Sequence, residues 1–251
     1  MAWFNFFSKP VVLHCYTNRA DVFNYSPIAK ASKFIPDWWK KIPKSNPVEN
    51  AVHPAPTMKH CAGFTDLYRK GFIIPMWSEL AIEIGEIGSD AYRYQYADEA
   101  SVAIAHSERQ RGTAYPTERY QQLKLESPWF LSCDEDIEFL LTEPTWNIDN
   151  PEIVKILPGV LNYKYQASTN MNTIWLRQNE PVIYTIDHNQ PIAHLIPLTQ
   201  RKVELKLHLV DNTEYTNLVR KNKLAVFIGK YAAIKKVSKE RGCPFHFKAE
   251  K

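Results

Sequence analysis

The chain has 251 residues, of which 45% are hydrophobic and 13% aromatic, and this composition argues against a disordered protein. It fits one large domain or a domain with appendages. Seventeen prolines against eight glycines favour a β-rich fold with many stiff corners over a helical bundle. Because the four cysteines are widely scattered, we expect buried reduced thiols and no disulfide framework.

The net charge of +4 is unevenly distributed along the chain. Ten lysines and arginines but only two acids fall between Arg220 and Lys251, so this segment carries +8 and the remainder −4. Such a segment could contact nucleic-acid phosphates or an acidic protein, and a solvated helix face is the simpler alternative. The predicted basic surface consists of Arg220, Lys221, Lys223, Lys230, Lys235, Lys236, Lys239 and Arg241.

The first 71 residues contain one clear strand pattern and one clear helix pattern. Residues 11–16 form an apolar run typical of a strand, and residues 58–71 have helical spacing that ends at Gly71. Between them lie the adjacent tryptophans Trp38 and Trp39, which cannot share one face of a helix or strand. We expect one ring to pack in a core and the other to face a partner or a second layer; two rings packed under a loop are the alternative.

The remainder of the chain is dominated by strand patterns. Residues 80–84 and 92–96 alternate with period two and predict a hairpin, whereas residues 97–113 are polar and compatible with a peripheral helix. Eight further strands, separated by turn signals, are predicted at 122–126, 128–133, 137–143, 152–157, 172–177, 181–187, 191–198 and 201–210.

These elements predict a mainly β (α+β) fold, either a sandwich, a jelly roll or a barrel, with peripheral helices. A long basic helix is expected at residues 213–242. The predicted organisation is a Pro- and aromatic-rich N-terminal segment at 1–56 that packs on the core, a β-rich core domain at 57–212, and a basic C-terminal helix and tail at 213–251.

Residues 159–198 read GVLNYKYQASTNMNTIWLRQNEPVIYTIDHNQPIAHLIPL. This stretch resembles the second half of the trimeric dUTPase and dCTP deaminase superfamily, whose pattern is G-V-[IL]-D-x-x-Y-x-G followed by I-x-x-G-[DQ]-x-[IL]-A-Q-L-I. The residues that match this pattern in register are Gly159, Val160, Leu161, Tyr165, Ile186, Ile192, Ala193, Leu195 and Ile196. The resemblance implies a dUTPase-like or jelly-roll-type β core.

The same resemblance implies a site at a hairpin over residues 159–168. In that family the hairpin holds a deoxyuridine ring, its Tyr stacks under the sugar, and its Asp activates the attacking water. Here the Asp position is Asn162, and an amide cannot act as a general base at neutral pH. The candidate ligand-binding residues are therefore Gly159, Leu161, Asn162, Tyr165 and His194, with no catalytic residue, metal or cofactor assigned.

Other patterns carry less information. His60 and Cys61, with Cys243 and His246, supply the residue types of a zinc site, but ordinary buried thiols and surface imidazoles explain them more simply. The acidic run at residues 134–136 is expected to be a solvated turn. The sequence contains no phosphate-binding loop, dinucleotide fingerprint or hydrolase elbow.

The chain as a whole also resembles a set of proteins of marine tailed phages, especially phages of cyanobacterial hosts. We therefore expect a non-enzymatic phage-type protein, located in the host cytoplasm or the virion, that acts in virion assembly or partner docking. Its expected partners are copies of itself, including a trimer, and a virion or host protein; nucleic acid is a further candidate through the C-terminal helix. No apolar run reaches the roughly 20 residues of a membrane-spanning helix, so no membrane partner is expected. The alternative function is a nucleotide-binding protein or an altered deoxynucleotide hydrolase that uses residues 159–168.

Overall fold

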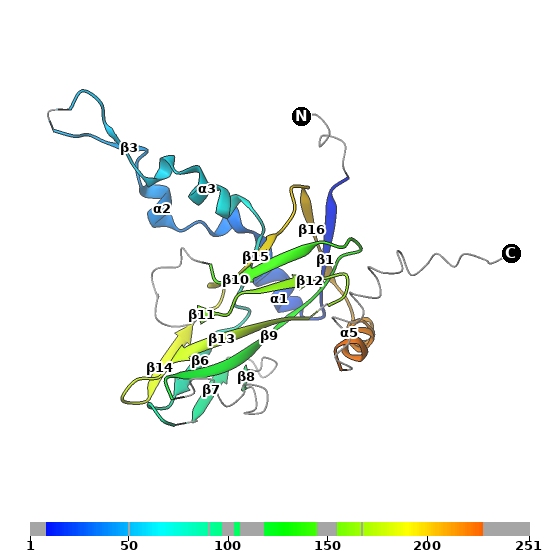
Figure 1. Ribbon diagram of the computed structural model, residues 1–251. Coiled ribbons are helices and arrows are strands. Elements are labelled where there is room, and N and C mark those ends of the chain that lie inside the picture. The colour runs from blue at the N-terminus through cyan, green and yellow to red at the C-terminus, as the bar shows by residue number, and fades with distance from the viewer. Residues whose placement is uncertain are drawn as a thin grey trace.

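The protein is a β sandwich from which a smaller helical segment projects (Figure 1). The computed structural model describes residues 9–49, 51–89, 91–96, 103–105, 118–144, 155–166 and 168–227. The first sheet has the strand order β11 (Lys155–Ile156), β13 (Ser168–Leu176), β9 (Tyr120–Ser132), β1 (Val11–Thr17) and β16 (Val203–Leu209), and β8 (Ala103–Ala105) also pairs with β9.

The second sheet has the order β12 (Gly159–Asn162), β10 (Glu138–Thr142), β15 (Pro191–Pro197), β5 (Phe72–Pro75) and β2 (Ala29–Lys30). A third sheet joins β14 (Val182–Ile186), β6 (Leu80–Ile84) and β7 (Tyr92–Tyr96), all antiparallel. The hairpin predicted from the alternation at 80–84 and 92–96 is therefore confirmed.

One continuous core joins these sheets. Leu13 and Leu125 from the first sheet and Phe139 and Leu195 from the second are each at most 1% exposed and belong to one cluster. Along β13 the buried positions alternate with half-buried ones, as the period of two requires when one face of a strand packs on the core. The mainly β class predicted from the sequence is confirmed.

The first and last strands of the chain's described part pair in the first sheet. Strand β1 pairs in parallel with β16, from Val11 opposite Val203 to Thr17 opposite Leu209, and on its other side it pairs with β9. Because β1 is an internal strand, part of the N-terminal segment is built into the sandwich. Helix α1 (Ala20–Tyr25), which follows β1, contributes Val22 to the core of the sandwich.

Residues 35–70 form a segment that we call the arm, which projects away from the sandwich (Figure 1). After β2 and the short 3-10 helix η2 (Ala31–Phe34), the arm contains α2 (Asp37–Lys41), the paired strands β3 (Ser45–Asn46) and β4 (Ala55–Pro56), the 3-10 helix η3 (Met58–His60) and α3 (Ala62–Arg69). Its own small apolar cluster has Trp39 and Tyr68 buried, with Ile35, Trp38 and Ile42 packed against them.

Two local predictions are wrong. A turn was expected at Ser127 and Pro128, but β9 continues through both residues, and the register with β13 shifts opposite them, between Ser168 and Asn170. A proline lacks the N–H that a regular ladder needs, so an irregular position accommodates it. Residues 103–105, expected within a helix, form strand β8 instead; the rest of 97–113 lies outside the described residues.

Within the segment predicted as the C-terminal helix, the structure describes α5 (Asn212–Phe227). Its predicted continuation to residue 242 lies outside the described residues. Within the described part of the chain, no helix has the length and apolar character needed to cross a membrane.

Candidate functional site

The segment predicted to be a ligand-binding hairpin is a crossover between two sheets. Strand β12 pairs with β10 in the second sheet, whereas β13, which begins at Ser168, pairs with β9 and β11 in the first. The chain passes from one sheet to the other through a turn at Tyr163–Tyr165. Because β12 and β13 are not partners, residues 159–168 do not form the predicted hairpin.

Asn162 holds this turn together. Its side chain is 0% exposed, and Nδ2 donates a hydrogen bond of 2.6 Å to Oδ1 of Asp136. Oδ1 of Asn162 accepts a hydrogen bond from the backbone N–H of Lys164 at 3.1 Å. The backbone carbonyl of Asn162 accepts from the backbone N–H groups of Tyr165 and Gln166. The amide thus acts within an Asx-type turn, as Asn does where the chain must reverse.

Asp136 is the residue at this turn that sequence reasoning missed. Besides the bond from Asn162, its Oδ2 accepts a hydrogen bond of 3.2 Å from the Tyr165 hydroxyl. A carboxylate therefore lies beside the position where the family motif would place its Asp, but it comes from the loop before β10. A recess of about 340 Å³ adjoins it, lined by Asp136, Ile137, Glu138, Leu198 and Thr199.

Tyr163, two residues before Tyr165, packs in the core of the sandwich. Tyr163 is 2% exposed, its ring lies 5.4 Å from that of Phe139, and its hydroxyl is 2.8 Å from Oγ1 of Thr169. Burial raises the pKa of the Tyr163 hydroxyl, which therefore stays protonated.

The candidate residue Gly159 does not need to be glycine for space, since a Cβ there would meet nothing within 4 Å. Leu161 is half-buried against the core.

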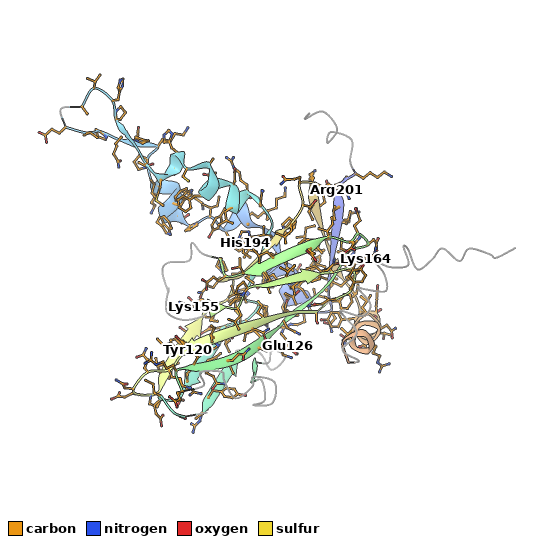
Figure 2. The ribbon with its side chains drawn as sticks, viewed as in Figure 1. Tyr120, Glu126, Lys155, Lys164, His194 and Arg201 are labelled. Atoms are coloured by element: carbon orange, nitrogen blue, oxygen red, sulfur yellow. The ribbon has the colours of Figure 1, made fainter. Side chains whose placement is uncertain are left out.

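His194 lies away from the turn. Strand β10 separates the two halves of the motif, because Leu141 pairs with Gly159 on one side and with Leu195 on the other. His194 is 1% exposed and its Nε2 donates to the carbonyl of Lys70 at 2.8 Å. Burial lowers the pKa of His194, an effect partly opposed by this hydrogen bond. Figure 2 shows His194 where the arm meets the sandwich.

The arm carries a charge excess that the sequence analysis assigned to the tail alone. Within residues 35–70 the chain has six lysines and arginines against three acids. The exposed cations include Lys40, Lys41 and Lys44, of which Lys40 contacts Asp37 at 2.8 Å. A charge count in windows of about forty residues would have found this second basic region.

The two adjacent tryptophans occupy different environments, as their neighbouring positions require. Trp39 is 5% exposed, whereas Trp38 is only half-buried, and the two rings meet edge to face at 5.9 Å. Phe64, which is 42% exposed, contacts the Trp39 ring at 6.2 Å. The arm therefore presents aromatic edges beside its cations.

Of the predicted C-terminal basic surface, the structure describes only the first part. Arg220 is exposed on α5, and Lys221 and Lys223 lie on the same helix. Tyr215 joins α5 to the sandwich by donating to the Pro128 carbonyl at 3.2 Å. The members outside the described residues are Lys230, Lys235, Lys236, Lys239 and Arg241.

The described residues contain no group of three or more His, Cys, Asp and Glu side chains that could hold a metal ion. His60 and Cys61 are exposed, and Cys243 and His246 lie outside the described part. No family model matches the chain. A search of curated proteins likewise finds no match.

Proposed function

We propose that the chain is a non-enzymatic, phage-type docking protein that acts in virion assembly or on a host partner, with the β sandwich as its scaffold. The observation that carries the proposal is the arm, which projects from the sandwich and combines aromatic edges with an excess of cations. The partner is an acidic surface of a virion or host protein.

The composition of the arm supports a contact surface. Phe64 and Met58 are 42% and 44% exposed, and Val52 at the far end is 92% exposed. Aromatic residues and methionine are enriched in protein interfaces, and complementary charge accelerates association and selects the partner. A segment whose purpose was only to cover the sandwich would bury these side chains against it.

The turn at Asn162 supports a role other than hydrolysis. Its amide is committed to the turn on both its donor and its acceptor side. The scaffold role is of the dUTPase-like kind implied by the motif, and self-assembly, including a trimer, belongs to the proposal, as does a location in the host cytoplasm or the virion. Symmetric assembly is the ordinary route by which a single chain forms repeated contacts.

The test reverses charge on the arm. Lys40, Lys41 and Lys44 are replaced together by Glu in a phage that encodes the chain, and the chain in purified particles is quantified by mass spectrometry. The matched control places three Glu at Lys155, Lys164 and Lys206, which are exposed on the sandwich. We expect less of the arm variant than of the control in purified particles, or less of it bound to the host protein that is captured with the wild-type chain. Equal behaviour of both variants would contradict it.

A second candidate is binding of a deoxynucleotide at the Asn162 turn, favoured by the Asp136 carboxylate and the adjoining recess. A bound nucleotide raises the melting temperature by mass action, so a panel of deoxynucleoside triphosphates tests this directly. The shift should disappear in Asp136→Asn. If no nucleotide produces a shift or is turned over, the second candidate is wrong.

A further inference from the structure

A cleft lined by cations lies where the arm joins the sandwich. It has a volume of about 290 Å³ and is bordered by three segments: the end of β2, the end of α3 with the start of β5, and the connection from β15 to β16. We call it the basic cleft. Its lining residues are Lys30, Arg69, Lys70, Gly71, Phe72, Pro197, Thr199, Gln200, Arg201, Lys202 and Val203.

Backbone contacts bring these three segments together. Gly71 has φ of +77°, and a Cβ there would lie 2.1 Å from the Leu195 carbonyl oxygen, so the chain after α3 passes directly against β15. The Ala31 N–H donates to the Gly71 carbonyl, and His194 donates to that of Lys70. The cations therefore sit on a fixed backbone frame, which reduces the ordering that a ligand must impose.

The cleft carries five cationic side chains, and none of its lining residues is acidic. Three of these cations have a carboxylate nearby: Arg201 donates two hydrogen bonds to Glu135, Lys202 contacts Glu204 at 2.7 Å, and Arg69 lies 3.7 Å from Asp66. The last two pairs are exposed and contribute little, because water screens them.

The other two cations are available to a ligand. Within the described residues, the ammonium groups of Lys30 and Lys70 form no hydrogen bond or ion pair, and both residues are exposed. Lys30 lies close enough to Glu204 to help lower the pKa of that carboxyl, although Lys202 has the larger effect. Like charges gathered at one concave site repel one another, and a bound anion removes that repulsion.

We propose that the basic cleft binds the phosphate groups of a small oligophosphate-bearing ligand. Its volume lies just below the range of about 300 to 1,000 Å³ that is usual for small-molecule sites, which suits two linked phosphates better than a long chain. Lys30 and Lys70 supply point charges, Arg69 supplies a planar fork of donors, and Thr199 supplies a hydroxyl. The proposal is argued separately from the docking function and from the Asn162 turn, although Arg69 and Lys70 belong to the arm and Thr199 also borders the recess beside Asp136.

Calorimetric titration of pyrophosphate into the full chain at low ionic strength tests the proposal. The cleft variant carries Lys30→Gln and Lys70→Gln, and the control carries Lys40→Gln and Lys41→Gln, which remove the same charge from exposed positions on α2. Pyrophosphate should bind the wild type and the control equally, and the cleft variant roughly tenfold more weakly or worse. The melting temperature without ligand shows that each variant is folded.

The outcomes separate a built site from diffuse attraction. If both variants lose affinity equally, or if the wild type does not bind pyrophosphate, the proposal is overturned. A double-stranded DNA fragment is titrated in parallel. Tighter binding of DNA than of pyrophosphate, lost equally in both variants, would mean that the arm attracts any polyanion, and this also overturns the proposal.

Discussion

The sandwich and the arm are stabilised by different amounts of buried apolar surface. In the sandwich, side chains as large as Trp129 and Trp175 are at most 1% exposed within a cluster that spans the sheets. Among the described residues of the arm, only Trp39 and Tyr68 are buried, and several apolar side chains remain in contact with water. A segment with so small a core depends on its junction with the sandwich, which makes that junction the informative place to perturb.

The largest expected effect comes from the sandwich core. Trp175→Ala should lower the free energy of unfolding by about 3 to 5 kcal/mol, because it leaves a cavity and removes the bond from Nε1 to the Thr173 hydroxyl. Trp39→Ala in the arm should lower the free energy of unfolding by only about 2 kcal/mol, because its cluster is small and can relax around the missing ring. Urea denaturation of both variants measures the difference. Equal effects would mean that the arm shares the core of the sandwich.

The junction itself is tested at Gly71. Gly71→Ala combines a φ of +77° with a Cβ placed 2.1 Å from the Leu195 carbonyl oxygen, so we expect a loss of about 3 kcal/mol or more. The matched control is Gly88→Ala, where φ is +84° but nothing lies within 4 Å, and only the backbone strain of about 1 kcal/mol applies. If the two variants are equally stable, the close approach at Gly71 is wrong.

At the crossover turn, Asn162→Asp places a second carboxylate beside Asp136, within the 2.6 Å contact that Nδ2 of Asn162 now makes. We expect a loss of about 2 kcal/mol at neutral pH, because like charges replace a hydrogen bond. The pKa of the new carboxyl is raised in the folded state, so the folded state binds more protons and the variant loses stability as the pH rises above about 4. Denaturation midpoints between acidic and neutral pH measure this slope.

Exchanging the two groups is the control for that variant. The double variant Asn162→Asp with Asp136→Asn restores one amide opposite one carboxylate, and it should regain most of the lost stability. If the double variant is no more stable than the single one, the contact between these side chains does not determine the stability of the turn.

The smallest effect is expected at His194, on the sandwich side of the junction. Burial lowers the pKa of His194 below 6.5, so the unfolded chain binds the additional proton and stability falls as the pH drops below that value. His194→Gln retains a donor for the Lys70 carbonyl but does not titrate. Between pH 7 and pH 5 the free energy of unfolding should fall less in the variant than in the wild type, and the difference is the contribution of the one titrating histidine. Urea denaturation of both proteins at the two pH values measures it.

Local patterns predicted most strands of the sandwich because in many of them, such as β1 and β13, buried positions alternate with half-buried ones. The alternation at residues 203–209 predicts β16, and the apolar run at 11–16 predicts β1. Neither pattern shows that these strands pair in parallel, since pairing joins residues almost two hundred positions apart. The predicted hairpin at 159–168 failed for the same reason: two strands adjacent in sequence belong to different sheets.

The candidate sites follow the same division. The sequence alone determined the mainly β class, most strand positions and the end of α3 just before a glycine, because each depends on residue type or on spacing over a few residues. Only the tertiary structure decided that Asp136 meets Asn162, that His194 belongs to the junction, and that the cations at the ends of β2 and α3 share a cleft with the connection from β15 to β16. These contacts join distant segments, and their geometry is set by packing between sheets, which no local pattern records.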